Sequence, residues 1–200
     1  MELVRKFFNL LQKKGDHVVK IEGERLYLKT FIESDARSLS ELLTNNKYFW
    51  AQYEPLHEEY FYTEDAQLRK ILESMQLMRV NREYSFGIYT KGRHQLIGHI
   101  SLYAIKKLPY SSAFIGYSID ERFTRKGIAS EAVNHLVRFG FNELNLHRIE
   151  AYVSPKNIGS IKVLERANFV REGLLRKLLY INGIWEDHYM YSILKEEYRM

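Results

Sequence analysis

The most informative absence in this sequence is cysteine, which does not occur among its 200 residues. Disulfide bonds, thiolate metal sites, iron–sulfur clusters and a covalent cysteine nucleophile are therefore excluded. Proline occurs 3 times and glycine 11 times, too rarely for a collagen-like or low-complexity chain. No apolar run approaches the roughly 18–20 residues that span a bilayer, so we expect no membrane span. These absences leave a compact globular protein, which we expect in the reducing cytoplasm.

The composition is that of a folded, slightly basic protein. Hydrophobic residues make up 46% of the chain, which is ordinary for a globular domain and too high for a disordered one. The length predicts one domain, or one domain with a small appendage. Lys and Arg number 30 against 25 Asp and Glu, and the net charge of +5 favours an anionic partner such as nucleic acid, a phosphorylated cofactor or an acidic substrate. A basic surface without such a partner explains this small excess equally well.

Residues 1–22 are interpreted as a basic amphipathic extension, and residues 23–200 as the main domain. Apolar side chains at positions 3, 4, 7, 8 and 11 have helical spacing, and Arg5, Lys6, Lys13 and Lys14 supply the charge. Such a helix could pack on its own domain or on a partner subunit, or it could dock on an anionic surface.

The rest of the chain predicts a mixed α/β fold. Alternating or apolar runs indicate about seven strands, at residues 25–31, 84–90, 95–105, 113–120, 147–153, 169–181 and 184–193. Four segments have helical spacing. The first two begin after caps at Ser34 and Thr63, and the other two begin at Gly127 and Asn157. Residues 45–62 read as an irregular aromatic segment. The helix between strands 113–120 and 147–153 implies that these two strands are parallel. We therefore expect a mostly antiparallel sheet with a central parallel pair and helices on both faces.

The segment with the clearest chemistry is the turn Arg125-Lys126-Gly127, which opens the helix after strand 113–120. Backbone N–H groups at a helix start point outward and attract anions, and a glycine lets the backbone approach one closely. The pattern lacks the dinucleotide fingerprint and the P-loop lysine. It predicts a diphosphate site, and the alternative is a tight turn with incidental surface charge.

This turn, with Ala129 after it and a later Asn157-x-x-Ser160 helix start, resembles the acetyl-CoA site of the GNAT N-acetyltransferases, in particular the ribosomal-protein-alanine N-acetyltransferases. The hairpin around Asn182-Gly183 fits the same family, and the likeness covers nearly everything from Glu24 to Leu194. The family usually has Gln or Arg three residues before the glycine, where this chain has Thr124. We expect that departure to remove some charge from the site without abolishing binding.

The resemblance implies a GNAT fold and direct transfer of an acetyl group from acetyl-CoA to a primary amine, without a protein nucleophile. The pantetheine arm would enter between two diverging parallel strands and pair with the backbone of Ser118 and Ile119. The resemblance also assigns Asn157 to the pantetheine arm and Ser160 to protonation of the departing sulfur, although both residues could simply cap their helix. It assigns the pyrophosphate to Arg125, Lys126, Gly127, Ile128, Ala129 and Ser130.

The general base is left open by the sequence. A relative is thought to use a carboxylate at the position that here is Leu179. Glu54, His99 and His188 are candidate substitutes, each with a structural role as the simpler alternative, and a water chain could also deprotonate an α-amine of pKa roughly 8. The histidines show no metal-ligand spacing such as His-Glu-x-x-His, so we expect no metal.

The acceptor is indicated by the aromatic segment at 45–62, which carries or adjoins Glu54, Glu58, Glu59, Glu64 and Asp65. An acidic, aromatic cleft would attract a cationic amine, although the aromatic rings could equally turn into the core. We expect a protein N-terminus as acceptor, with contact to a ribosome. A small amine (polyamine or aminoglycoside), a non-catalytic acyl-CoA-binding module and a nucleic-acid-binding protein are the alternatives. The protein could be a monomer or a homodimer.

Overall fold

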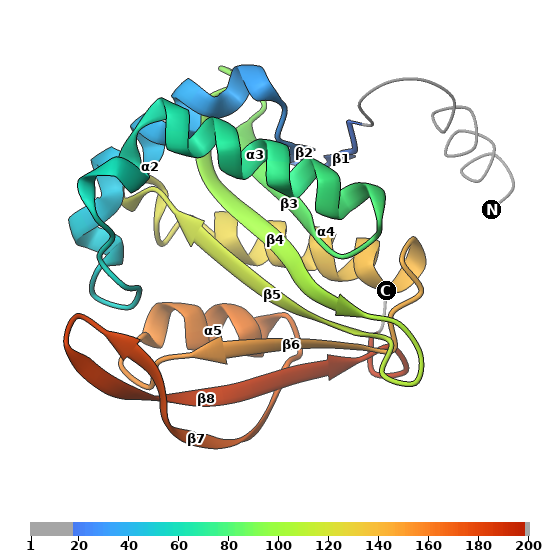
Figure 1. The fold of residues 1–200 in the computed structure, drawn as a ribbon. Helices are drawn as coiled ribbons and strands as arrows, with labels where there is room; N and C mark the ends of the chain where they lie inside the picture. The colour runs from blue at the N-terminus through green and yellow to red at the C-terminus, as the bar shows by residue number, and fades with distance from the viewer. Residues whose placement is uncertain (1–17, 199–200) are drawn as a thin grey trace, which may run out of the picture.

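A computed structural model of the protein describes residues 18–198, which form an eight-stranded mixed sheet with four α-helices (Figure 1). The strand order is β1-β2-β3-β4-β5-β6-β8-β7, and among neighbouring strands the β5–β6 pair alone is parallel. The strands are β1 (Lys20–Glu22), β2 (Leu26–Thr30), β3 (Tyr84–Thr90), β4 (Leu96–Lys106), β5 (Ser112–Ile119), β6 (Arg148–Val153), β7 (Val170–Ile181) and β8 (Ile184–Leu194). The helices are α2 (Ala36–Trp50), α3 (Glu64–Arg79), α4 (Ile128–Asn142) and α5 (Ile158–Arg166), with short 3₁₀ turns at Glu33–Asp35, Glu59–Tyr62 and Glu121–Phe123.

The predicted fold class is confirmed. Helix α4 makes the crossover between the parallel strands β5 and β6, and its apolar stripe is buried. The β7–β8 hairpin turns at Asn182 and Gly183, whose φ angles of 48° and 92° are the positive values that a two-residue turn of this hand requires. The Asn-Gly pair in the sequence predicts this turn for the same reason.

The two faces of the sheet are covered by different helices. Along β4, the ring of His99 lies edge-on to Trp50 of α2, with centroids 5.4 Å apart, whereas Leu102 lies beside Gly140 of α4. Side chains alternate between faces along a strand, so α2 and α4 cover opposite faces. Figure 1 shows α3 next to α2, and α5 contacts α4.

Three details differ from the sequence-based expectation. The sheet has an eighth strand, β1, whose three residues are too few to show a pattern of their own. Helix α2 continues to Trp50, because Asn46 and Trp50 extend its buried stripe into the segment expected to be irregular. Its cap was also wrongly predicted: Ser34 lies inside the preceding 3₁₀ turn, and Asp35 precedes the helix. The cap at Thr63 is confirmed, since its hydroxyl accepts from the Ala66 N–H at 3.3 Å.

The helix expected near the start of the chain lies outside the described residues, so the division into residues 1–22 and 23–200 stays a prediction. Strand β1, at the end of the first of these segments, pairs with β2. Within residues 18–198, no helix has both the length and the apolar character needed to cross a membrane.

Candidate active site

The parallel strands β5 and β6 pair over only part of their length. The ladder joins Ser112–Phe114 to Arg148–Glu150 and stops there, although β5 continues to Ile119 and β6 to Val153. Figure 1 shows the two strands separating beyond this point. Their carboxyl-terminal halves therefore have backbone groups that no ladder between these two strands uses.

The register shows which backbone groups of β5 point at that opening. The Asp120 N–H donates to Ile97 C=O at 2.8 Å, and hydrogen-bonded positions alternate along an antiparallel pair. The backbone of Ser118 is therefore directed at β4, whereas the groups of Tyr117 and Ile119 are directed at β6. The Ile119 C=O accepts a hydrogen bond from Trp50 Nε1 at 3.0 Å. Of the two β5 residues assigned to the pantetheine arm, Ser118 and Ile119, Ile119 has its backbone on the side of the opening.

The turn predicted to bind an anion forms the start of α4. Gly127 is the residue before the helix, with φ +75°, and Arg125 also has a positive φ of 59°. The first N–H groups of the helix lie at Ile128, Ala129 and Ser130, where no intrahelical partner exists. Arg125 is exposed, whereas Lys126 Nζ turns back to donate to the Arg122 C=O at 2.8 Å.

Sequence reasoning missed Arg25, which holds this turn in place. Its guanidinium donates to the C=O of Lys126 at 2.8 Å and of Gly127 at 3.3 Å, and its Nε pairs with Glu131 Oε2 at 2.8 Å. Arg25 lies about one hundred positions earlier in the chain, so no local pattern could have shown the contact. The turn is thus fixed from β2, and the guanidinium adds positive charge beside the helix start.

Helix α5 places the next two predicted residues together. Asn157 Oδ1 accepts from the Ser160 N–H at 3.0 Å, so Asn157 does cap the helix. The Ser160 hydroxyl makes no hydrogen bond within residues 18–198, while its C=O accepts from Tyr117 Oη at 3.3 Å. Burial raises the pKa of Tyr117. The sequence analysis did not single out Tyr117, whose side chain leaves β5 on the face covered by α4 and α5.

On the other face of β5, Ser118 contacts a carboxylate. Ser118 Oγ donates to Glu54 Oε1 at 2.5 Å. Ser118 is buried and Glu54 is half-buried, and burial raises the pKa of Glu54 more than the hydrogen bond from Ser118 lowers it. Of the five acidic residues expected to line an acceptor cleft, Glu54 is the one that reaches β5, while Glu59 pairs with Lys47 and Asp65 pairs with Arg69.

The two histidine candidates for a base occupy different places. His99 is the cross-strand neighbour of Ser118, its Nε2 has no hydrogen-bond partner, and burial lowers its pKa to about 4. His188 is buried on β8, where its Nδ1 lies 3.2 Å from the Glu186 C=O. Leu179 is 40% exposed on β7. His99 therefore lies beside Ser118, which bonds to Glu54, and His188 belongs to the other part of the sheet.

The segment that carries Glu54 is joined to the β7–β8 hairpin. Asn182 Nδ2 donates to the Ala51 C=O at 2.7 Å, and Asn182 Oδ1 accepts from the Leu56 N–H at 2.9 Å. One side chain thus connects the loop after α2, beside β5, with the hairpin next to β6. This bridge lies at the carboxyl ends of the separating strands.

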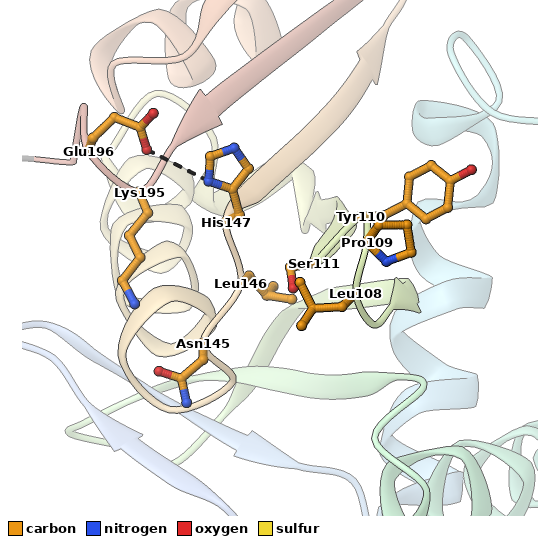
Figure 2. Close-up of a pocket in the computed structure, with 9 residues that line it drawn as sticks. All are labelled: Leu108, Pro109, Tyr110, Ser111, Asn145, Leu146, His147, Lys195 and Glu196. Carbon is orange, nitrogen blue, oxygen red and sulfur yellow. Dashed lines mark ion pairs between the residues drawn. The ribbon is translucent and has the colours of Figure 1, made fainter.

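A shallow hollow of about 520 Å³ lies at the opposite end of the parallel pair (Figure 2). It lies where β5 and β6 begin, near Ser111 and His147, and His147 Nδ1 approaches Glu196 Oε2 at 3.8 Å. None of the residues assigned to acetyl transfer lines it. Within residues 18–198, no three His, Asp or Glu side chains are grouped so as to hold a metal ion.

Comparison with known proteins gives a consistent result. The family model of the acetyltransferase (GNAT) domain matches residues 25–170. The chain is 40% identical over 177 residues to the probable N-acetyltransferase YjcK of Bacillus subtilis. The aligned residues cover 88% of this chain and 98% of that protein.

Two solved structures have the same fold over most of the chain. The ribosomal-protein-S5-alanine acetyltransferase from Vibrio fischeri superposes with a TM-score of 0.86 and 34% identity, covering 91% of this chain and 100% of that one. Mycobacterium smegmatis RimJ in complex with CoA-disulfide superposes with a TM-score of 0.84 and 26% identity, covering 92% and 89%.

Proposed function

Because this chain belongs to the GNAT family of acetyltransferases, we propose that it transfers the acetyl group of acetyl-CoA to the N-terminal amine of a ribosomal or other protein. The observation that carries the coenzyme part is the open start of α4 beside the strands that separate after Phe114 and Glu150. A basic helix start suits a diphosphate, and the unused β5 backbone suits the amides of a pantetheine arm. The binding of CoA by the RimJ relative supports the same assignment.

In this proposal each residue of the site has one task. The N–H groups at Ile128, Ala129 and Ser130, with Arg125 and Lys126, hold the pyrophosphate, and Gly127 lets the backbone approach it. The Ile119 C=O is already bonded to Trp50, and the Ile119 N–H is the backbone donor that stabilises the oxyanion. Asn157 orders the α5 start, and Ser160 gives its hydroxyl proton to the departing thiolate.

The acceptor is proposed from the relatives and from the charge of the site. The Vibrio fischeri relative is named for an alanine of a ribosomal protein, and Glu54 places a carboxylate beside the carboxyl end of β5. A protein α-amine of pKa roughly 8 is mostly an ammonium group near pH 7, so it must lose a proton before it can attack. Such a substrate would place the enzyme in the cytoplasm, in transient contact with ribosomal proteins.

The experiment offers acetyl-CoA with a panel of ribosomal N-terminal peptides, spermidine and an aminoglycoside, and follows thiol release and product mass. We expect acetylation on the α-nitrogen of at least one peptide, with kcat/KM about tenfold or more above the small amines. Acetylation of the small amines alone would replace the proposed acceptor by a polyamine or aminoglycoside. Calorimetry should show acetyl-CoA binding, and its absence at millimolar ligand would contradict the assigned coenzyme site.

A further inference from the structure

We propose that Glu54 is the acceptor-side catalytic residue: its carboxylate binds the ammonium group of the incoming amine and takes its proton. The inference rests on the proposed amine acetylation and names the general base that the sequence left open. It applies to a peptide N-terminus and to a small amine alike, because both enter as ammonium groups.

The first argument is the position of Glu54 across β5 from the proposed coenzyme side. Ser118, which bonds to Glu54, leaves β5 on the face of His99 and α2. Tyr117 leaves on the opposite face and reaches the Ser160 C=O on α5. Glu54 and Ser160 therefore approach the unpaired half of β5 from opposite faces. An acyl donor on the α5 side and an amine on the α2 side would meet there.

The second argument is that the loop holds Glu54 in place from several directions. The Glu54 N–H donates to the Trp50 C=O at 3.0 Å, and Trp50 is itself anchored to β5 through Ile119. Asn182 binds the chain on both sides of Glu54, at Ala51 and Leu56. A carboxylate on a loop held in this way can keep one geometry through a reaction cycle, as a general base must.

The third argument is that Glu54 lacks a cation. Ser118 donates to Oε1, while Oε2 has no hydrogen bond within residues 18–198. The neighbouring groups provide no counter-charge: His99 on β4 is neutral near pH 7, because burial lowers its pKa to about 4. Asp120, after β5, is already paired with Arg122 at 2.5 Å, and Lys70 on α3 lies over the ring of Phe61, 4.1 Å from its centroid. An ammonium group supplies the missing charge and a hydrogen bond to Oε2.

The proton balance follows from these contacts. The ammonium gives one proton to Glu54, which releases it to water, and the neutral amine attacks the thioester carbon. The C–N bond forms, the C–S bond breaks, and the second nitrogen proton leaves with the thiolate through Ser160. Burial raises the pKa of Glu54, which makes the carboxylate a stronger base than an exposed glutamate.

The test is the pH dependence of kcat/KM in Glu54→Gln, measured with the best acceptor from the panel. We expect kcat/KM to fall about 10²- to 10³-fold. The acidic limb of the wild-type profile, which reports ionisation of Glu54, should be replaced by a limb that follows deprotonation of the free amine, of pKa roughly 8. Acetyl-CoA affinity and melting temperature should stay near the wild-type values, and Glu54→Asp should recover part of the activity. Glu73→Gln on the exposed face of α3 makes the same charge change and should leave the kinetics unchanged.

The outcomes separate this inference from the function on which it rests. If the wild type acetylates an amine and Glu54→Gln keeps both its rate and the acidic limb, Glu54 is not the base and the proposed function stands. A higher KM with unchanged kcat and an unchanged limb would also overturn the inference, since Glu54 would then only attract substrate. If the wild type acetylates no amine, the proposed function fails first and the inference falls with it.

Discussion

At the residue scale, the hydroxyl groups of Ser160 on α5 and Tyr117 on β5 are both candidates for the general acid, and both lie on the same side of β5. The Ser160 hydroxyl makes no hydrogen bond within the described chain, whereas Tyr117 Oη donates to the Ser160 C=O at 3.3 Å. A departing thiolate needs a donor whose proton is free to move. Ser160 therefore fits the role of general acid, and Tyr117 fits that of a support for the α5 start.

Ser160→Ala tests this assignment. We expect turnover to fall about 10- to 100-fold, which is at or below the lower limit of the usual loss for a general acid, because water can replace a hydroxyl in part. Acetyl-CoA affinity by calorimetry should be unchanged, since the N–H of residue 160 still donates to Asn157. Tyr117→Phe is the matched variant, as it removes one hydroxyl from the same face. A larger loss of turnover in Tyr117→Phe than in Ser160→Ala would reverse the two roles.

At the element scale, the site depends on segments that lie far apart in the sequence. Arg25, the residue before β2, fixes the start of α4. The hairpin of β7 and β8 holds the loop after α2 through Asn182. Each contact is a side-chain hydrogen bond between a residue next to a strand of the sheet and a segment outside the sheet. The α4 contact shapes the proposed coenzyme site, and the Asn182 contact shapes the proposed acceptor site.

Asn182→Gly isolates the second contact. Glycine accepts the positive φ of 48° without strain, so the hairpin keeps its turn while both hydrogen bonds to the loop are lost. We expect a loss of about 1–2 kcal/mol in the free energy of unfolding. The acceptor KM should rise severalfold, with acetyl-CoA affinity unchanged. Denaturant unfolding and steady-state kinetics measure both effects, and a change in coenzyme affinity instead would place the bridge on the coenzyme side.

At the scale of the whole molecule, the sheet has two portions that are joined by one short parallel ladder of hydrogen bonds. Strands β1–β5 are joined to β6, β8 and β7 through three residue pairs between β5 and β6. The residues that we propose for the coenzyme and for the acceptor lie where that ladder ends. The hollow of Figure 2 lies at the other end of the same pair and takes no part in the proposed chemistry.

The basic N-terminal segment gives a prediction for the whole molecule, because docking on an anionic surface is one of the two roles that its sequence allows. Deletion of residues 1–14 should leave kcat/KM for a short peptide within about twofold of the full chain, because no residue assigned to the site lies there. Cosedimentation with ribosomes should weaken, and the loss should be largest at low salt, where basic side chains bind RNA most strongly. Equal cosedimentation of both forms would show that the segment has another role.

The sequence by itself determined the elements and their order. Its apolar periodicity predicts the α4 crossover, Asn182-Gly183 predicts the hairpin, and Gly127 predicts the helix start. These features depend on residues close together in the chain, which is why a pattern can show them. The ends of α2 were predicted less well, because its burial depends on the packing of Trp50 against β4 and β5.

Only the tertiary structure decided how the site is assembled. Glu54 was one of several candidate bases in the sequence, and we propose it because of its contact with Ser118, 64 positions later in the chain. Arg25 and Asn182 act over 101 and more than 120 positions, and Tyr117 acts through a helix that the chain reaches 43 positions later. Side-chain contacts of this range depend on how strands and helices pack in space. The spacing of residues along the sequence does not show them.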